Sequence, residues 1–432
     1  MSKVSPNRLG IKQILGALES GDLRATDVTQ ACLDRIMARN AEVNAFVSFD
    51  VRQAMTAAAE LGDFNVKRPL FGVPFAVKDV IDTKAYPTAY GSPIYAGHFP
   101  ERDASCVTLA QEHGGVLLGK VATCEFATQT PSNTRNPLDT RRTPGGSSSG
   151  SAAAVSDYMA PFAFGTQTTG STIRPAVYCG VVGFKPSYGL INNAGLKPLS
   201  PEQDTISLFT RDVEDAATVL YGLHGVRCPE LPRIVPRIGV LRSSQWDHAR
   251  PETVEALESL TDRMATAGAS ISELTMPAEL EAMIEIQGRI SAYEARHSLA
   301  YERLYQHDRL SSRLQGRLAQ EQHTTADEYF AFKQRARQAR RLAAQWFDDV
   351  DVLLYPASEG EPELGLMETG SPRYGGLWTL LHLPCVSQPI AAGPAGMPLG
   401  AQFIGAYGDD LRVLAAAEFM RAHVQYVHKL PA

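Results

Sequence analysis

The sequence lacks the features that would indicate nucleic acid or a membrane as a partner. It has no basic tail and no interleaving of aromatic with basic residues, and its net charge is −6. No stretch approaches about 18 consecutive apolar residues, the length that a membrane-spanning helix needs. The first ten residues are polar and lack the apolar run of a signal peptide. We therefore expect no nucleic-acid partner, no membrane association and a cytoplasmic location.

Metal-binding and disulfide patterns are also missing. The 6 cysteines and 10 histidines are scattered over 432 residues, without a CxxC pair, an HExxH or an HxH. Such motifs supply the ligands of zinc sites. Dispersed cysteines in a chain this long are typical of reduced, buried thiols. The sequence therefore predicts a protein without a metal or another cofactor.

The sequence does contain an alternation of short apolar segments, typical of buried strands, with segments of helical pattern. Leu70–Ile81 is apolar on both faces, as a buried strand is. Helical patterns at Ala104–His113 and Ser151–Met159 are each accompanied by a short apolar segment, at Val116–Leu118 and Phe162–Gly165. This alternation predicts an α/β fold with layers of helices around a sheet.

The second half of the chain differs in pattern. Residues Pro251–Phe347 are almost wholly helical in pattern and rich in charge. Strand-like segments then return at Asp351–Tyr355, Cys385–Pro389 and Gly400–Ile404. Because strands come from both ends of the chain, we expect one intertwined domain over residues 1–432, with a helical insertion at about 251–347 that shapes the substrate site.

Lys78 lies in the apolar segment Leu70–Ile81 and is the first candidate for chemistry. Burial of an ammonium group is costly unless the group is paired or neutral. Lys78 is therefore either a lysine at a strand end that reaches solvent, or a lysine of lowered pKa that acts as a general base. This segment alone leaves both interpretations open.

A second candidate is the Gly- and Ser-rich stretch Pro144–Ser151, which contains Ser147. Stretches of this composition are commonly flexible loops. This one runs directly into Ala152–Val155, a block of good helix formers. We therefore expect a fixed loop that leads into a helix N-terminus.

The third candidate is Ser171, which follows a glycine in the segment Gly165–Pro175. Acyl transfer needs a hydroxyl that attacks a carbonyl and N–H groups that hold the oxyanion. The amides of Thr168, Thr169 and Gly170, together with that of Ser171 itself, could supply those N–H groups. The sequence has no GxSxG motif and no His/Asp pair at positions that would indicate a catalytic triad. A Ser-His-Asp triad is therefore the weaker hypothesis.

Together these segments resemble the amidase signature family, from about Leu9 to the C-terminal region and most continuously over Gly145–Pro186. The resemblance implies a mixed β-sheet between layers of α-helices. It also implies a triad of a lysine, a serine in a cis peptide linkage and a nucleophilic serine. These roles fall on Lys78, Ser147 and Ser171, and they predict an amidohydrolase that cleaves a C–N bond through an acyl-enzyme.

Two residues depart from the family pattern. The family usually has Gly-Gly-Ser where this chain has Thr169-Gly170-Ser171. Because a β-branched residue disfavours positive φ, either Thr169 has an ordinary backbone conformation or the oxyanion hole is re-shaped. Gln203 replaces an apolar residue often found before Asp204, and the sequence offers no reason for it.

Arg174 is the residue that indicates the chemical class of the substrate. It either pairs with a carboxylate inside the fold or binds a substrate carboxylate with its planar guanidinium. The pattern Ser171-Thr-Ile-Arg-Pro175 resembles malonamidase-type members of the family, in which the matching arginine binds the acid group of a short amide. This resemblance predicts a small, carboxylate-bearing amide as the substrate.

Two alternative functions, each from a different class of protein, stay open. An amidotransferase subunit would release ammonia from glutamine or asparagine and pass it to a protein partner. A non-catalytic binding protein on the same scaffold would not need Lys78, Ser147 and Ser171, all of which are retained. The expected partners are a small-molecule amide and, as an open possibility, a second copy of the chain in a homodimer.

Overall fold

A computed structural model describes residues 4–320 and 324–428. At its centre is one 11-stranded sheet with the order β1-β3-β2-β4-β6-β5-β10-β11-β9-β7-β8. The strands span Phe46–Phe49 (β1), Pro74–Lys78 (β2), Val116–Val121 (β3), Phe162–Gln167 (β4), Val182–Lys185 (β5), Thr205–Thr210 (β6), Arg237–Arg242 (β7), Ser270–Thr275 (β8), Val352–Pro356 (β9), Cys385–Ala392 (β10) and Pro398–Ile404 (β11).

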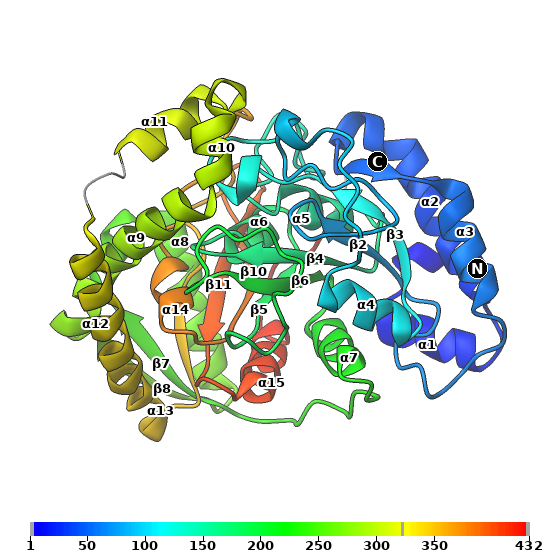
Figure 1. Cartoon of the computed structure of the whole chain (residues 1–432). Helices are drawn as coiled ribbons and strands as arrows, with labels where there is room; N and C mark the ends of the chain where they lie inside the picture. The colour runs from blue at the N-terminus through cyan, green and yellow to red at the C-terminus, as the bar shows by residue number, and fades with distance from the viewer. Residues whose placement is uncertain (1–3, 321–323, 429–432) are drawn as a thin grey trace.

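Helices surround this sheet, with α1–α3 on the side of β3 and α12 and α13 on the side of β7 and β8 (Figure 1). Their bounds are Ile11–Glu19 (α1), Ala25–Val43 (α2), Val51–Glu60 (α3), Ser105–Glu112 (α4), Ser149–Ser156 (α5), Ile173–Tyr178 (α6), Val213–Leu223 (α7), Pro251–Thr266 (α8), Ala278–Ser298 (α9), Ala300–Tyr305 (α10), Ser312–Gln320 (α11), Ala326–Ala344 (α12), Trp346–Asp349 (α13), Gly376–Leu380 (α14) and Asp410–Arg421 (α15).

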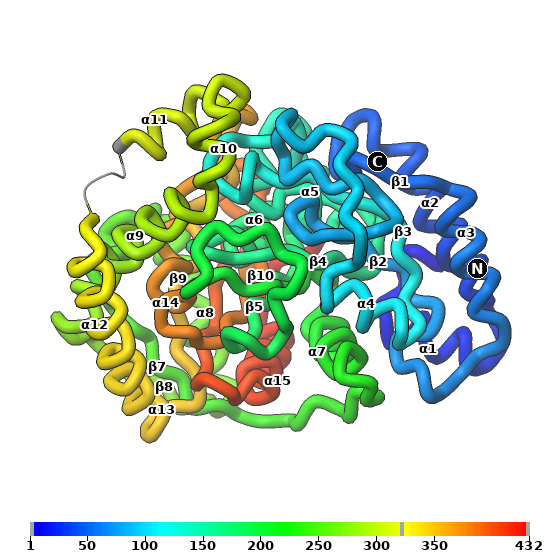
Figure 2. The backbone as a smooth tube through the Cα atoms, viewed as in Figure 1, coloured from blue at the N-terminus to red at the C-terminus, as the bar shows by residue number. Residues whose placement is uncertain are grey.

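The sheet is mixed. Strand β2 runs parallel to both β3 and β4, and β7 runs parallel to both β8 and β9. Antiparallel pairs, among them β5–β10, join these two parallel regions. Strands of the last third of the chain therefore lie beside strands from its middle (Figure 2). The predicted α/β fold, with a mixed sheet between helical layers, is confirmed.

The buried strands match the predicted apolar segments, since every residue of β2, β3 and β4 is buried. The prediction for Pro251–Phe347 was incomplete, because β8 interrupts the helices there at Ser270–Thr275. β8 lies at the edge of the sheet and is largely exposed, with Ile271 and Leu274 packed against the core. Its polar residues conceal the strand in a segment of otherwise helical pattern.

Helix α5 shows how the Gly- and Ser-rich stretch is held. All eight residues of Ser149–Ser156 are buried, and most carry small side chains. A Cβ at Gly150 would lie 2.2 Å from the backbone nitrogen of Ala122 and 2.6 Å from the carbonyl oxygen of Ala45. Only glycine allows this approach, so the small residues let α5 lie close to β2, β3 and β4. The expected fixed loop before a helix is confirmed.

The remaining structural features concern thiols, metals and membranes. All six cysteines are free, and Cys228 alone is not fully buried. Within the described ranges, no three His, Cys, Asp or Glu side chains are grouped as a metal site requires. No helix of the described residues is long and apolar enough to cross a membrane.

Candidate active site

Lys78 and Ser147 meet at the carboxyl ends of β2 and β4, beside the start of α5, and Ser171 lies in the loop that follows β4. Lys78 is the last residue of β2, and Thr166 is next to last in the parallel strand β4. Ser147 lies two residues before α5 and Ser171 two residues before α6. The carboxyl ends of parallel strands are where α/β proteins commonly bind ligands.

Lys78 is buried and joined to two hydroxyl groups. Its Nζ donates to Ser147 Oγ at 2.8 Å and to Thr166 Oγ1 at 2.7 Å. Burial lowers the pKa of Lys78 to about 7, and the nearby Cys124 and Asp204 only partly oppose that change. Lys78 is therefore the buried lysine of lowered pKa, and an appreciable fraction of it is neutral near pH 7.

Ser147 is held by a buried loop. The Gly146–Ser147 peptide bond is cis, and the Ser147 carbonyl accepts a hydrogen bond of 3.1 Å from the Cys124 amide. A Cβ at Gly146 would lie 2.8 Å from Cys124 Sγ and 2.9 Å from Thr369 Cγ2, so the loop has no room for a side chain there. Packing and hydrogen bonds thus fix the serine that contacts Lys78.

The Ser171 loop has free N–H groups and is partly exposed to solvent. Gln167 Oε1 accepts from the amides of Thr172 and Ile173, at 2.9 and 3.2 Å. In the described part of the chain, the amides of Thr169, Gly170 and Ser171 have no hydrogen-bond acceptor. Between residues 159 and 187, Thr169 and Ser171 alone are not buried. Unpaired N–H groups beside a partly exposed serine are what the binding of an oxyanion requires.

Thr169 has an ordinary backbone conformation, because its φ is not positive. Of the two interpretations of this departure from Gly-Gly-Ser, the structure supports the first. Thr168, which precedes it, donates from its hydroxyl to Asp204 Oδ1 at 2.6 Å. Asp204 also accepts from the Leu199 and Ser200 amides, and its burial raises the pKa of its carboxyl group.

Arg174 does not pair with a carboxylate among the described residues. Its Nε donates to the Thr369 carbonyl at 2.6 Å, and its Nη2 donates to the Gly146 carbonyl at 2.6 Å. Its Nη1 is buried and has no partner. Burial lowers the pKa of the Arg174 guanidinium. The guanidinium therefore keeps one donor free beside the loop that carries Ser171, since Nη1 would lie 3.1 Å from a Cβ at Gly170.

The structure also reveals polar residues that the sequence analysis missed. Thr166 binds the candidate base, Gln167 shapes the turn before α6, and Asp204 anchors Thr168. Thr166 could have been found from the sequence, because it is a polar residue in a buried strand just before the Ser171 loop. The role of Gln167 could not, since it depends on the folding of the loop back onto β4.

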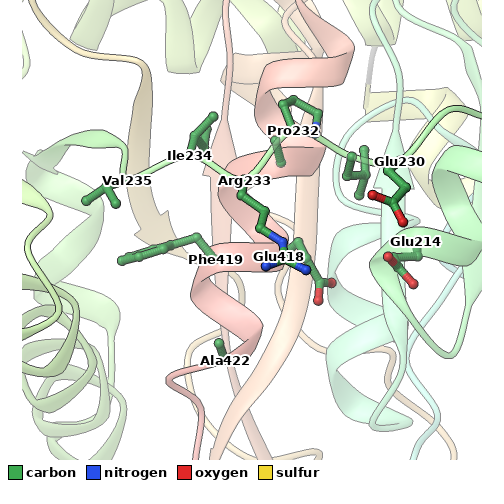
Figure 3. Close-up of a pocket in the computed structure, with 11 residues that line it drawn as sticks. Glu214, Glu230, Pro232, Arg233, Ile234, Val235, Glu418, Phe419 and Ala422 are labelled. Atoms are coloured by element: carbon green, nitrogen blue, oxygen red, sulfur yellow. The ribbon is translucent and has the colours of Figure 1, made fainter.

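A separate groove of about 470 Å³ lies between α15 and the segment before β7. Figure 3 shows the Arg233 side chain extending toward Glu418 of α15 across this groove. None of the candidate catalytic residues lines it. The candidate site is therefore the buried polar cluster around Lys78, which is separate from this groove.

The sequence model of the Amidase family matches residues 27–414. A glutamyl-tRNA(Gln) amidotransferase subunit of Lawsonia intracellularis is 29% identical over 478 aligned positions, which cover 96% of this chain and 97% of that protein. A solved amidase structure is 28% identical with a TM-score of 0.87 and covers 96% of this chain and 100% of that one. The solved structure of a glutamyl-tRNA(Gln) amidotransferase subunit from Thermotoga maritima is 25% identical with a TM-score of 0.82, covering 100% and 98%.

Proposed function

The chain belongs to the amidase family, whose enzymes act on C–N bonds, and we propose that it cleaves an amide through an acyl-enzyme on Ser171. The observation that carries this proposal is the contact between Lys78 and Ser147. A buried lysine with a pKa of about 7, hydrogen-bonded to a serine, is suited to accept a proton at neutral pH.

The proposed reaction begins with proton transfer. Neutral Lys78 takes the proton of Ser147, and Ser147 takes the proton of Ser171 as the Ser171 oxygen attacks the amide carbonyl. The free N–H groups of the Thr168–Ser171 loop stabilise the negative oxygen of the tetrahedral intermediate. When the C–N bond breaks, the proton returns through Ser147 to the leaving amine. Water then attacks the ester by the same route and releases the acid.

The contacts of Arg174 support the hypothesis that the substrate of this reaction carries a carboxylate. Its Nε and Nη2 are bound to backbone carbonyls, which hold the guanidinium plane in place. The buried Nη1 has no partner, and an unpaired buried donor is costly unless a ligand satisfies it. A small amide that carries a carboxylate on its acyl side would supply that acceptor.

A second candidate function, which the comparisons support better than that of a free-standing hydrolase, is that of an amidotransferase subunit, in which the same site would release ammonia for a protein partner. Its support is the name of the relatives, since the Lawsonia protein belongs to a glutamyl-tRNA(Gln) amidotransferase. The 478 aligned positions exceed the 432 residues of this chain, so that relative carries segments that this chain lacks. Co-purification from the source cell separates the two functions, because the subunit would be recovered in a stoichiometric complex and the hydrolase alone.

We further propose that residues 1–432 act as a single amidase domain, with the helices of residues 251–347 shaping the substrate site. Support comes from α9, whose Gln287 donates from Nε2 to Thr169 Oγ1 at 3.4 Å. A side chain from the helical segment thus reaches the loop that carries Ser171.

Ser171 provides the direct test of the proposed function. The purified protein should release ammonia from members of a panel of small amides, and a fluorophosphonate should label Ser171. Ser171→Ala should lose both properties, with activity falling by several orders of magnitude and the thermal midpoint unchanged. Labelling of another serine, or an active alanine variant, would disprove the assignment.

A further inference from the structure

Thr169 lies two residues before the proposed nucleophile and, like Ser171, is partly exposed to solvent. It and Ser171 are the two residues between 159 and 187 that are not buried. The Thr169 hydroxyl makes one hydrogen bond, as the acceptor from Gln287 Nε2. A threonine hydroxyl has one proton to donate and two lone pairs. The proton of the Thr169 hydroxyl therefore remains available for another acceptor.

The Gln287 side chain lies against Thr169 in a confined space. A Cβ at Gly376 would come within 2.8 Å of Gln287 Oε1 and 3.0 Å of Thr169 Cγ2. A Cβ at Gly375 would come within 2.5 Å of the Thr169 carbonyl oxygen. These two glycines at the start of α14 thus leave room for the pair, and Gln287 itself is 6% exposed.

A chain of hydrogen bonds behind Gln287 sets the orientation of its amide. The Glu294 carboxylate accepts from the Ser200 hydroxyl at 2.6 Å, which commits the Ser200 proton. Ser200 Oγ then accepts from Gln203 Nε2 at 3.0 Å, which turns Gln203 Oε1 toward Gln287. Gln203 Oε1 accepts from Gln287 Nε2 at 2.6 Å. Gln287 must therefore present its NH₂ group, and not its oxygen, to Gln203 and Thr169.

These hydrogen bonds explain why residue 203 is a polar glutamine in this protein. Gln203 is completely buried, and both ends of its amide are used between Ser200 and Gln287. The two departures from the family pattern, Thr169 and Gln203, are thus joined through one residue of α9. A donor amide facing Thr169 Oγ1 occupies one of its lone pairs and leaves the O–H proton to point elsewhere.

We propose that Thr169 is a specificity-determining residue whose hydroxyl donates a hydrogen bond to an oxygen acceptor on the acyl side of the substrate. Gln287 is a positioning residue, because it acts through Thr169. The inference rests on the proposed function, since it places the acceptor beside the carbonyl that Ser171 attacks. It differs from the role proposed for Arg174, whose guanidinium is fixed by the backbone carbonyls of Thr369 and Gly146.

The test compares Thr169→Val with Thr169→Ser. Valine keeps the shape and removes the hydroxyl, whereas serine keeps the hydroxyl. For the monoamide of a short dicarboxylic acid, Thr169→Val should lower kcat/KM about ten-fold, as expected for one hydrogen bond to a charged group. The ratio of kcat/KM between this monoamide and the alkyl amide of the same length should therefore fall several-fold in Thr169→Val and keep its wild-type value in Thr169→Ser. Equal losses on the two amides, or no loss on either, would overturn the proposal.

Gln287→Met tests the positioning role. This variant keeps the side-chain length and removes the amide, so it should reduce the preference for the carboxylate-bearing amide by about three-fold. In the Thr169→Val background it should have no further effect on that preference, because the hydroxyl that it positions is gone. A further loss of preference in the double variant would show that Gln287 acts independently of Thr169.

A binding measurement keeps this test separate from the proposed function. The free short dicarboxylate should slow fluorophosphonate labelling of Ser171 in the wild type and in Thr169→Ser, but much less in Thr169→Val. Normal labelling that the dicarboxylate does not slow in the wild type would overturn the Thr169 proposal alone. Failure of Ser171 to be labelled at all would overturn the proposed function, and the Thr169 proposal with it.

Discussion

The Arg174 guanidinium donates a hydrogen bond of 2.6 Å to the carbonyl oxygen of Gly146. Gly146 is joined to Ser147 by the cis peptide bond, and Arg174 lies in the first turn of α6, just after Ser171. One side chain therefore connects the loop of the proposed relay serine with the helix that follows the proposed nucleophile. A substitution of Arg174 should affect the position of the Gly146 loop as well as the proposed binding of a carboxylate, so its test must measure both.

Arg174→Lys should lower the preference for a carboxylate-bearing amide. Lysine keeps the charge but cannot bind two carbonyls and a carboxylate in one plane. The KM for a carboxylate-bearing amide should rise about ten-fold or more, since each 1.4 kcal/mol corresponds to a factor of about ten. Steady-state kinetics with a neutral amide of the same size serves as the control and should change much less.

The thermal midpoint completes the Arg174 experiment. If the arginine serves only to hold the Gly146 loop, Arg174→Lys should lower the midpoint and impair both amides equally. An unchanged ratio of kcat/KM between the two amides would therefore rule out carboxylate binding by Arg174.

The pH dependence of activity should follow the protonation of Lys78. Its pKa of about 7 lies below the ordinary lysine value, so the base is charged and inactive at lower pH and neutral at higher pH. The kcat/KM should therefore rise with pH, with a midpoint near 7, and level off above it. Ammonia release measured from about pH 5 to about pH 9 gives this profile. The same rising limb in Lys78→Ala would show that another group is responsible.

Thr166→Val should move that profile to lower pH. The Thr166 hydroxyl accepts a hydrogen bond of 2.7 Å from Lys78 Nζ, and an acceptor favours the charged ammonium. Its removal should lower the pKa of Lys78 further, so the rising limb should shift in the acidic direction. Thr166→Ser keeps the acceptor and should retain the wild-type midpoint. A shift toward higher pH in Thr166→Val would contradict this assignment of the Thr166 hydroxyl.

Lys78 and Ser147 should behave as one unit in mutant kinetics. Each single alanine variant should lose most of the activity, and the double variant should lose about as much as either one, because a proton relay fails when any member is absent. Single-turnover rates of the three variants check this. Losses that multiply in the double variant would indicate that Ser147 has a structural role only.

Most of the features that could be predicted from the sequence are formed by residues that lie close together in the chain. The apolar segment that becomes β2, the fixed loop before α5 and the alternation of strands and helices depend on local patterns, and the structure confirms them. Strand β8 was missed because an exposed edge strand lacks the apolar run that identifies buried strands. The likeness to the amidase family also rests on a nearly continuous segment, Gly145–Pro186.

The amino-acid sequence by itself determined the family, the α/β class and the candidates Lys78, Ser147 and Ser171. Only the tertiary structure decided which groups meet. Lys78 reaches Ser147 across 69 positions and Thr166 across 88, and Gln287 reaches Thr169 across 118. Local patterns specify strands and helices, but the order of 11 strands drawn from the whole chain brings these side chains together. The lowered pKa of Lys78 is likewise a tertiary property, because burial by surrounding elements causes it.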